Sequence, residues 1–158
     1  MDVHLSFRAA QKETHMISVR QLLDKKGYDV LSVLPSNTVY EAITKMAERG
    51  VGALLVIREE KLIGILSERD YARKVILQGR RSQETTVEEI MTPEPFTVTP
   101  SQTVTECMEL MTEKRIRHLP VVSEGRVTGI ISIGDVVKSV ISNQAAMIEQ
   151  LETYITRG

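Results

Sequence analysis

The sequence has one cysteine among 158 residues, carries a net charge of −1 and contains no long apolar run. Because a single cysteine has no partner, Cys107 excludes an internal disulfide and a metal site built from several cysteines. The balanced charge argues against a general nucleic-acid binder, which usually shows a clear basic excess. No apolar stretch approaches the roughly 20 residues that a membrane-spanning helix needs. We therefore expect neither a nucleic-acid nor a membrane partner.

Residues that could bind a metal are also few. His4, His15 and His118 lack the close spacing of a zinc motif, so no metal is expected. Cys107 lies in the apolar-periodic stretch TVTECMELM, which predicts a buried small side chain, with a reactive thiol as the alternative. The N-terminus lacks the apolar core of a secretory signal. These features predict a reducing, cytoplasmic setting.

The chain contains the same unit twice. A shift of 65 residues aligns Val30–Ile76 with Pro95–Ile141 without a gap, and 17 of these 47 positions are identical. In this alignment GILSERDYARK (from Gly64) matches GIISIGDVVKS (from Gly129). Such agreement in order and spacing indicates two copies of one supersecondary unit.

Each copy has the pattern β-α-β-β-α. Apolar residues at three- and four-residue steps predict the helices, and short apolar runs joined by polar turns predict the strands. The elements predicted in the first copy are Val30–Leu34, Val39–Arg49, Ala53–Ile57, Leu62–Leu66 and Glu68–Leu77. Those predicted in the second copy are Phe96–Thr99, Val104–Lys114, Leu119–Val122, Val127–Ile131 and Ile133–Ser142.

One copy alone cannot bury both faces of its small sheet. We therefore expect an α/β (α+β) fold in which two repeats pack sheet to sheet with pseudo-twofold symmetry. The expected domains are a leader (1–16, mobile or upstream of the true start), repeat 1 (17–82), repeat 2 (83–145) and a helical tail (146–158) that extends the last helix. Residues 17–28 resemble the connector stretch TTVEEIMTPEP, with its helical turn at Val87–Met91, and are expected to pack at the opposite end.

The paired motif has a purely structural interpretation. Ser67 with Asp70, and Ser132 with Asp135, have the S-x-x-[DE] spacing of a helix capping box. Such a cap contributes about 1 kcal/mol to each helix. A binding role uses the same geometry, because the free amides at the start of a helix can hold a phosphate. The two interpretations are compatible.

The tandem unit resembles the cystathionine β-synthase (CBS) domain, and the pair resembles a Bateman module. The resemblance rests on VGALLVI, LIGILSERD, EIMTP, RIRHLPVV and GIISIGDVVK, and covers about residues 17–142. It implies a stand-alone, non-catalytic regulatory sensor that binds AMP, ADP, ATP, NAD or S-adenosylmethionine in clefts between the repeats. It also implies a homodimer and a regulated protein partner that the sequence does not identify.

The resemblance assigns ligand roles to the motif residues. It places Asp70 and Asp135 on the ribose hydroxyls, and Ser67 and Ser132 on phosphate or ribose. Arg69 and Arg73 are candidates for phosphate contacts near the first motif, although a solvated basic helix face is the alternative.

The same resemblance combines the aspartate of one repeat with strand residues of the other. The Asp70 cleft would then gain Arg117 and His118, although a histidine at a strand edge often has only a structural role. The Asp135 cleft would be lined by Gly52, Ala53 and Ala42. This arrangement predicts that the phosphate end of a ligand prefers the cleft at Asp70.

Two other functional classes compete with a ligand sensor. The repeats could form a structural dimerisation module whose clefts bind nothing. An enzyme is disfavoured, because the sequence shows no nucleophile–base pair, no metal cluster and no phosphate-binding G-x-x-x-x-G-K-[ST] loop.

Overall fold

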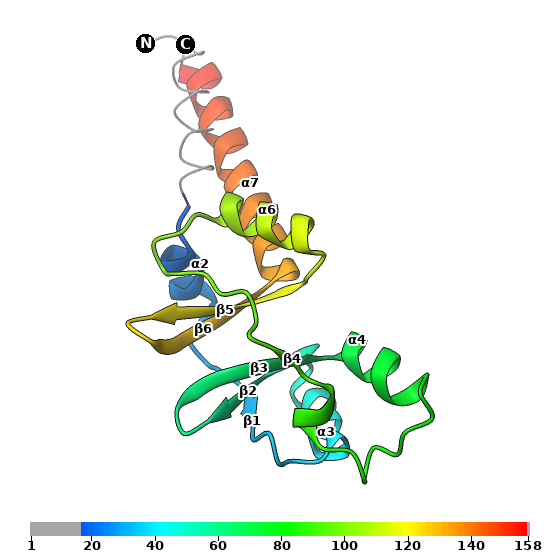
Figure 1. Cartoon of the computed structure of the whole chain (residues 1–158). Helices are drawn as coiled ribbons and strands as arrows, with labels where there is room; N and C mark the ends of the chain where they lie inside the picture. Colours follow the sequence, from blue (N-terminus) through cyan, green and yellow to red (C-terminus); the bar gives the residue numbers. More distant parts are fainter. Residues whose placement is uncertain (1–16, 158) are drawn as a thin grey trace. The chain divides into compact units, whose positions relative to one another are not determined.

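The computed structural model describes residues 17–157, so the predicted leader (1–16) lies outside the described residues. Within them the chain forms two compact units (Figure 1). The first unit comprises residues 17–28, 98–121 and 130–157, and the second comprises residues 29–97 and 122–129. Helices and strands occur together along the chain, which confirms the α+β class. The packing of the repeats against each other stays a prediction.

The second unit is built on a four-stranded sheet with the order β1-β2-β3-β4. Its strands are β1 (Ser32–Val33), β2 (Ala53–Arg58), β3 (Lys61–Ser67) and β4 (Thr92–Pro93). β1 runs parallel to β2, whereas the β2–β3 and β3–β4 pairs are antiparallel. Glu59 and Glu60, with φ of 48° and 65°, form the turn between β2 and β3, and two positive φ angles suit the twist of a tight hairpin.

Helices complete this unit. α3 (Val39–Arg49) is capped at its start by Thr38 and at its end by Gly50, which adopts the left-handed conformation. The predicted helix Glu68–Leu77 is divided into two elements, α4 (Glu68–Tyr71) and the π-helix η1 (Ala72–Ile76) that continues it. α5 (Val87–Ile90) follows. The core of the unit is formed by Val33, Val39, Ala42, Met46, Leu54, Val56, Leu66, Val75, Val87 and Ile90.

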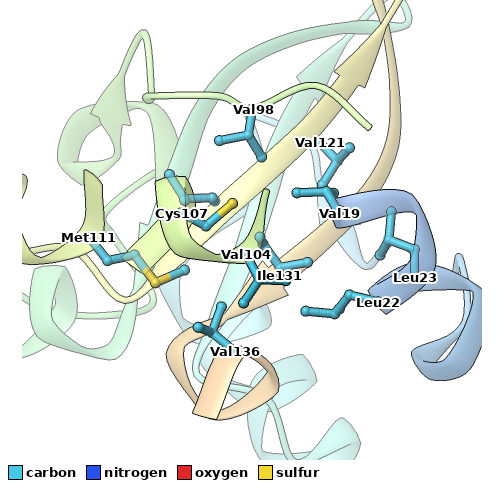
Figure 2. Packing of buried hydrophobic residues seen from close by; sticks show 11 residues of the cluster. Val19, Leu22, Leu23, Val98, Val104, Cys107, Met111, Val121, Ile131 and Val136 are labelled. Carbon is cyan, nitrogen blue, oxygen red and sulfur yellow. The ribbon is translucent and has the colours of Figure 1, made fainter. Parts of the chain in front are cut away.

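The first unit contains α2 (Val19–Lys26), α6 (Val104–Lys114), β5 (His118–Ser123), β6 (Arg126–Ser132) and α7 (Ile133–Arg157). Figure 2 shows buried side chains from α2, α6 and α7 gathered around Val121 and Ile131 of the two strands. Cys107 is fully buried among them, which confirms the predicted small core side chain. α7 runs without a break to Arg157, so the predicted tail does extend the last helix.

A proline explains why the two copies differ in sheet pairing. In the first copy the Leu55 N–H donates to the Leu31 carbonyl (3.1 Å), which supports the parallel β1–β2 pair. The matching residue of the second copy is Pro120, which has no N–H to donate. The predicted strand Phe96–Thr99 is accordingly reduced to one isolated bridge between Val98 and Val121.

The two short helices are exchanged between the repeats. α2 lies before the first copy of the aligned unit (residues 30–76), yet its buried residues Val19, Leu22 and Leu23 belong to the core that contains the helices of the second copy. α5 lies before the second copy of the aligned unit (residues 95–141), yet its Val87 and Ile90 belong to the core of the second unit, together with residues of the first copy. The prediction that residues 17–28 pack at the opposite end is therefore confirmed.

Both exchanged helices are held by the same backbone hydrogen bonds. The Val19 N–H donates to the Gln102 carbonyl (2.8 Å), and the Val87 N–H donates to the Asn37 carbonyl (2.9 Å). Isolated antiparallel bridges join Ser18 to Thr103 and Thr38 to Thr86. The exchange thus follows the internal repeat.

Candidate ligand-binding site

Both motif serines and aspartates form the predicted capping boxes. At the end of β3 the Ser67 N–H donates to Asp70 Oδ2 (2.9 Å), and the Asp70 N–H donates to Ser67 Oγ (3.1 Å). At the end of β6 the Ser132 N–H donates to Asp135 Oδ2 (2.8 Å), and the Asp135 N–H donates to Ser132 Oγ (3.1 Å). Each carboxylate is therefore fixed at the start of a helix that directly follows a strand.

Asp70 has further polar partners within the second unit. Its Oδ1 accepts a hydrogen bond from Thr92 Oγ1 (3.2 Å) and lies 3.1 Å from Lys74 Nζ. Lys74 also donates to the Ile90 carbonyl (3.0 Å) at the end of α5. The Asp70 side chain is 13% exposed, so it is largely shielded from solvent.

Asp135 receives its cation from the other end of the chain. Lys26 Nζ, on the last residue of α2, lies 2.6 Å from Asp135 Oδ2 and also donates to the Ile130 carbonyl (2.6 Å). Burial alone would raise the pKa of Asp135, but the hydrogen bonds from Lys26 and the Ser132 amide outweigh burial and lower it. The carboxylate is thus held in its charged form.

Lys26 is the site residue that the sequence reasoning missed. In the second motif stretch GIISIGDVVKS the only cation is Lys138, whereas Lys26 lies 109 positions before Asp135. A signal was present, since SVRQLL from Ser18 resembles TVEEIM from Thr86. That comparison places Lys26 opposite Glu94, so a cation at this position belongs to one copy only.

A groove of about 740 Å³ lies between α2 and α7 in the first unit. Lys25 and Lys26 line it from α2, and Asp135 and Lys138 line it from α7. The second motif therefore faces a concave surface lined by three lysines and two carboxylates, those of Asp24 and Asp135.

The predicted strand residues lie beside the motif of their own repeat. The Glu68 N–H donates to the Gly52 carbonyl (3.0 Å), and Ala53 pairs with Ser67 across β2 and β3. The Ile133 N–H donates to the Arg117 carbonyl (2.8 Å), and His118 begins β5. The crosswise combination implied by the resemblance stays a prediction.

The remaining candidates differ in exposure. Arg69 on α4, Arg73 on η1 and Arg117 are exposed, and His118 is half-buried. Ala42 is fully buried in the core of the second unit, and Ala53 is 4% exposed. Their roles at a ligand stay predictions, and the buried position of Ala42 does not favour its role.

The described residues offer little catalytic chemistry outside these motifs. Burial raises the pKa of Cys107 to about 11, so this thiol is not an activated nucleophile. Among residues 17–157 no group of three or more His, Cys, Asp or Glu side chains could hold a metal ion. None of the helices in the same stretch is long and apolar enough to cross a membrane.

The family model for the CBS domain matches residues 18–76 and again residues 87–142. The CBS domain-containing protein CBSX3, mitochondrial, of Arabidopsis thaliana is 45% identical over 127 residues, which are 77% of this chain and 62% of that protein. The CBS domain-containing protein YhcV of Bacillus subtilis is 35% identical over 123 residues, which are 78% of this chain and 87% of that protein. The chain thus spans less than two thirds of CBSX3.

Solved structures match over a similar extent. The crystal structure of the CBS domain NE2398 has a TM-score of 0.78 and 47% identity, and the match covers 80% of this chain and 99% of that one. The CBS domain pair of MJ0100, solved with 5′-methylthioadenosine and S-adenosyl-L-methionine, has a TM-score of 0.70 and 26% identity, with 78% and 94% covered. A hexameric CBS-CP12 protein from cyanobacteria has a TM-score of 0.70 and 27% identity, with 77% and 71% covered.

Proposed function

The chain belongs to the CBS-domain family as a CBS domain pair, a regulatory module, and from this premise we propose that it senses an adenosine-containing ligand without catalysing a reaction. The ligand class comprises AMP, ADP, ATP, NAD and S-adenosylmethionine. The proposal is supported by the MJ0100 pair, which was solved with two adenosine compounds. No metal is required by this proposal.

One observation carries it: the two copies present a carboxylate in the same capped position. Asp70 and Asp135 are each fixed by a serine at the junction of a strand and a helix. A carboxylate has about four acceptor sites, so it can serve a cap and still accept hydrogen bonds from ribose hydroxyls. Free helix amides and nearby cations would favour the phosphate.

The cations near the two motifs suggest how phosphate would be held. Arg69 and Arg73 stand beside the first motif, whereas Lys26 and Lys138 stand beside the second. We retain the proposal that the phosphate end prefers the cleft at Asp70, because guanidinium groups bind phosphate with two hydrogen bonds. The same proposal includes ligand contacts from strand residues of the opposite repeat. These are Arg117 and His118 in the cleft at Asp70, and Gly52 and Ala53 in the cleft at Asp135.

The test is calorimetric titration of the full chain with each of the five compounds. We expect Asp70→Asn and Asp135→Asn to weaken binding of the responsive compound at least tenfold at their own sites. Asparagine keeps an oxygen that can accept the capping hydrogen bond, so the variants should stay folded. Asp29→Asn, the same substitution at an exposed position outside both motifs, is the matched control. A folded protein that responds to none of the compounds contradicts the proposal.

A structural dimerisation module is the second candidate. It is favoured by the fact that both carboxylates already have protein partners, since Lys74 and Thr92 contact Asp70 and Lys26 contacts Asp135. Under this alternative the aspartate variants change stability, and no compound gives a binding isotherm.

The proposal includes self-association and an unidentified regulated protein. The hexameric CBS-CP12 protein is an assembled relative in the fold, and we propose a homodimer for this chain. We also propose the cytoplasm as its location, although the related CBSX3 is described as mitochondrial.

A further inference from the structure

The last helix extends well beyond the core that holds its start. In α7 the residues that belong to or pack against the first unit's core are Ile133, Val136 and Val140. From Ile141 to Arg157 the helix continues for more than four turns with no described side chain in that core. Helices in proteins owe most of their stability to burial of an apolar face. None of the described side chains of this stretch belongs to or packs against the buried core of the first unit, and Met147 and Leu151 are only half-buried.

The exposed apolar residues of this stretch repeat every seven residues. Ile141, Ile148 and Ile155 are 60%, 54% and 71% exposed. Leu151 lies four residues before Ile155, and Gln144 takes the corresponding place before Ile148. We call Ile141, Gln144, Ile148, Leu151 and Ile155 the α7 seam. The seam has the a and d spacing of a coiled coil, with isoleucine at each a position.

We propose that the α7 seam binds the α7 seam of a second copy of this chain as a parallel two-stranded coiled coil. The inference concerns an interaction surface and goes beyond ligand sensing.

The charge distribution favours a second copy over a charged partner. Residues 139–148 contain no charged side chain, and every residue of the seam is uncharged. Two identical neutral seams therefore meet without electrostatic repulsion, whereas an acidic or basic partner gains nothing from them.

The residue types at the seam favour two parallel strands. Isoleucine at a with leucine at d is the combination that favours parallel dimers. In a parallel pair Gln144 faces Gln144 of the second copy, so the two amides can hydrogen-bond to each other. An antiparallel pair would place Gln144 against an apolar a layer and leave its amide unsatisfied, at a cost in stability. A single polar layer of this kind fixes the register.

The chain's own first 16 residues fit the seam less well. Large apolar residues do not follow one another at alternating three- and four-residue steps in the sequence MDVHLSFRAAQKETHM. An identical helix supplies the matching period.

Disulfide crosslinking of the full chain tests the proposal. Gln144→Cys should form a covalent dimer under mild oxidation at least tenfold faster than Ser142→Cys, which lies on another face of the same helix turn. Cys107 is fully buried and contributes no background. Adding Ile148→Asp to Gln144→Cys should abolish the rate advantage, whereas adding Gln150→Asp, at an exposed position outside the seam, should preserve it.

Equal crosslinking of Gln144→Cys and Ser142→Cys would overturn the proposal, as would an Ile148→Asp change without effect. A covalent dimer that forms only after removal of residues 1–16 would show that this segment covers the seam, and would overturn it too. Nucleotide titration of Ile148→Asp separates the two proposals. If Ile148→Asp abolishes crosslinking while the ligand response is unchanged, the seam is supported independently of ligand binding. If no variant responds to any ligand but Ile148→Asp still abolishes crosslinking, the ligand proposal fails and the seam is still supported.

Discussion

At the scale of single residues, the carboxylate of Asp135 links the stability of the first unit to pH. Its pKa is lowered in the folded chain because Lys26 and the Ser132 amide stabilise the charged form more than burial destabilises it. In the unfolded chain the pKa of the same group is about 3.9. The stabilisation is therefore present above the unfolded pKa and is lost as the pH falls through the folded one.

We predict that Asp135→Asn removes this acid-dependent part of the stability. The wild-type protein should be the more stable of the two near neutral pH, and the difference should shrink as the pH is lowered below about 4. Urea unfolding at a series of pH values measures both curves. Lys26→Ala should weaken the same dependence, while Asp29→Asn serves as an exposed control. Parallel curves for wild type and Asp135→Asn would contradict the assignment.

At the scale of elements, the glycine of the first motif allows two strands to approach closely. Gly64 in β3 pairs with Pro93 in β4. A Cβ at this position would lie 2.5 Å from Met91 Sδ and 3.0 Å from the Thr92 carbonyl oxygen. The methionine side chain can move, but the backbone oxygen belongs to the paired strand. The glycine of the G-I-x-S-x-x-D motif thus serves β3–β4 pairing.

We predict that Gly64→Ala destabilises the protein by about 1–3 kcal/mol, the usual cost of forcing extra volume into a packed site. Gly134→Ala is the matched comparison, because its Cβ would meet only Ser132 Oγ, at an ordinary 3.6 Å. In α7 that substitution should be neutral or stabilising by up to about 1 kcal/mol. Chemical denaturation of both variants decides the matter, and equal losses would argue against the close approach at Gly64.

The order of the elements could be predicted from the sequence because hydrophobic period and turn residues are local signals. Both capping boxes were predictable for the same reason, since serine and aspartate stand three residues apart. Two features were not. The loss of the strand before α6 depends on the missing N–H of Pro120, a residue of another strand. The Lys26–Asp135 contact joins residues 109 positions apart, which no local pattern records.

At the scale of the whole molecule, the exchange of α2 and α5 means that neither repeat is complete as a continuous piece of sequence. The core of the first unit needs Leu23, which comes before the first repeat's strands. The core of the second unit needs Ile90, which lies in the connector before the second repeat. A cut between the repeats would deprive each core of one helix. The internal repeat therefore predicts which elements match each other, but it does not predict which elements share a core.

We predict that single core truncations in the exchanged helices will loosen distant segments. Leu23→Ala should cost about 2–5 kcal/mol and should accelerate amide hydrogen exchange in residues 98–121 more than in residues 29–97. Ile90→Ala should show the opposite pattern, with faster exchange in residues 29–76 than in residues 98–121. Hydrogen exchange with mass spectrometry, under conditions where the native state predominates, measures both because local opening reports the stability of each unit. If Leu23→Ala accelerated amide hydrogen exchange only in residues 29–76, the assignment of α2 to the core of the first unit would be contradicted. If both variants accelerate exchange equally everywhere, the two cores unfold as one, and the separate contributions of α2 and α5 must then be read from a double variant.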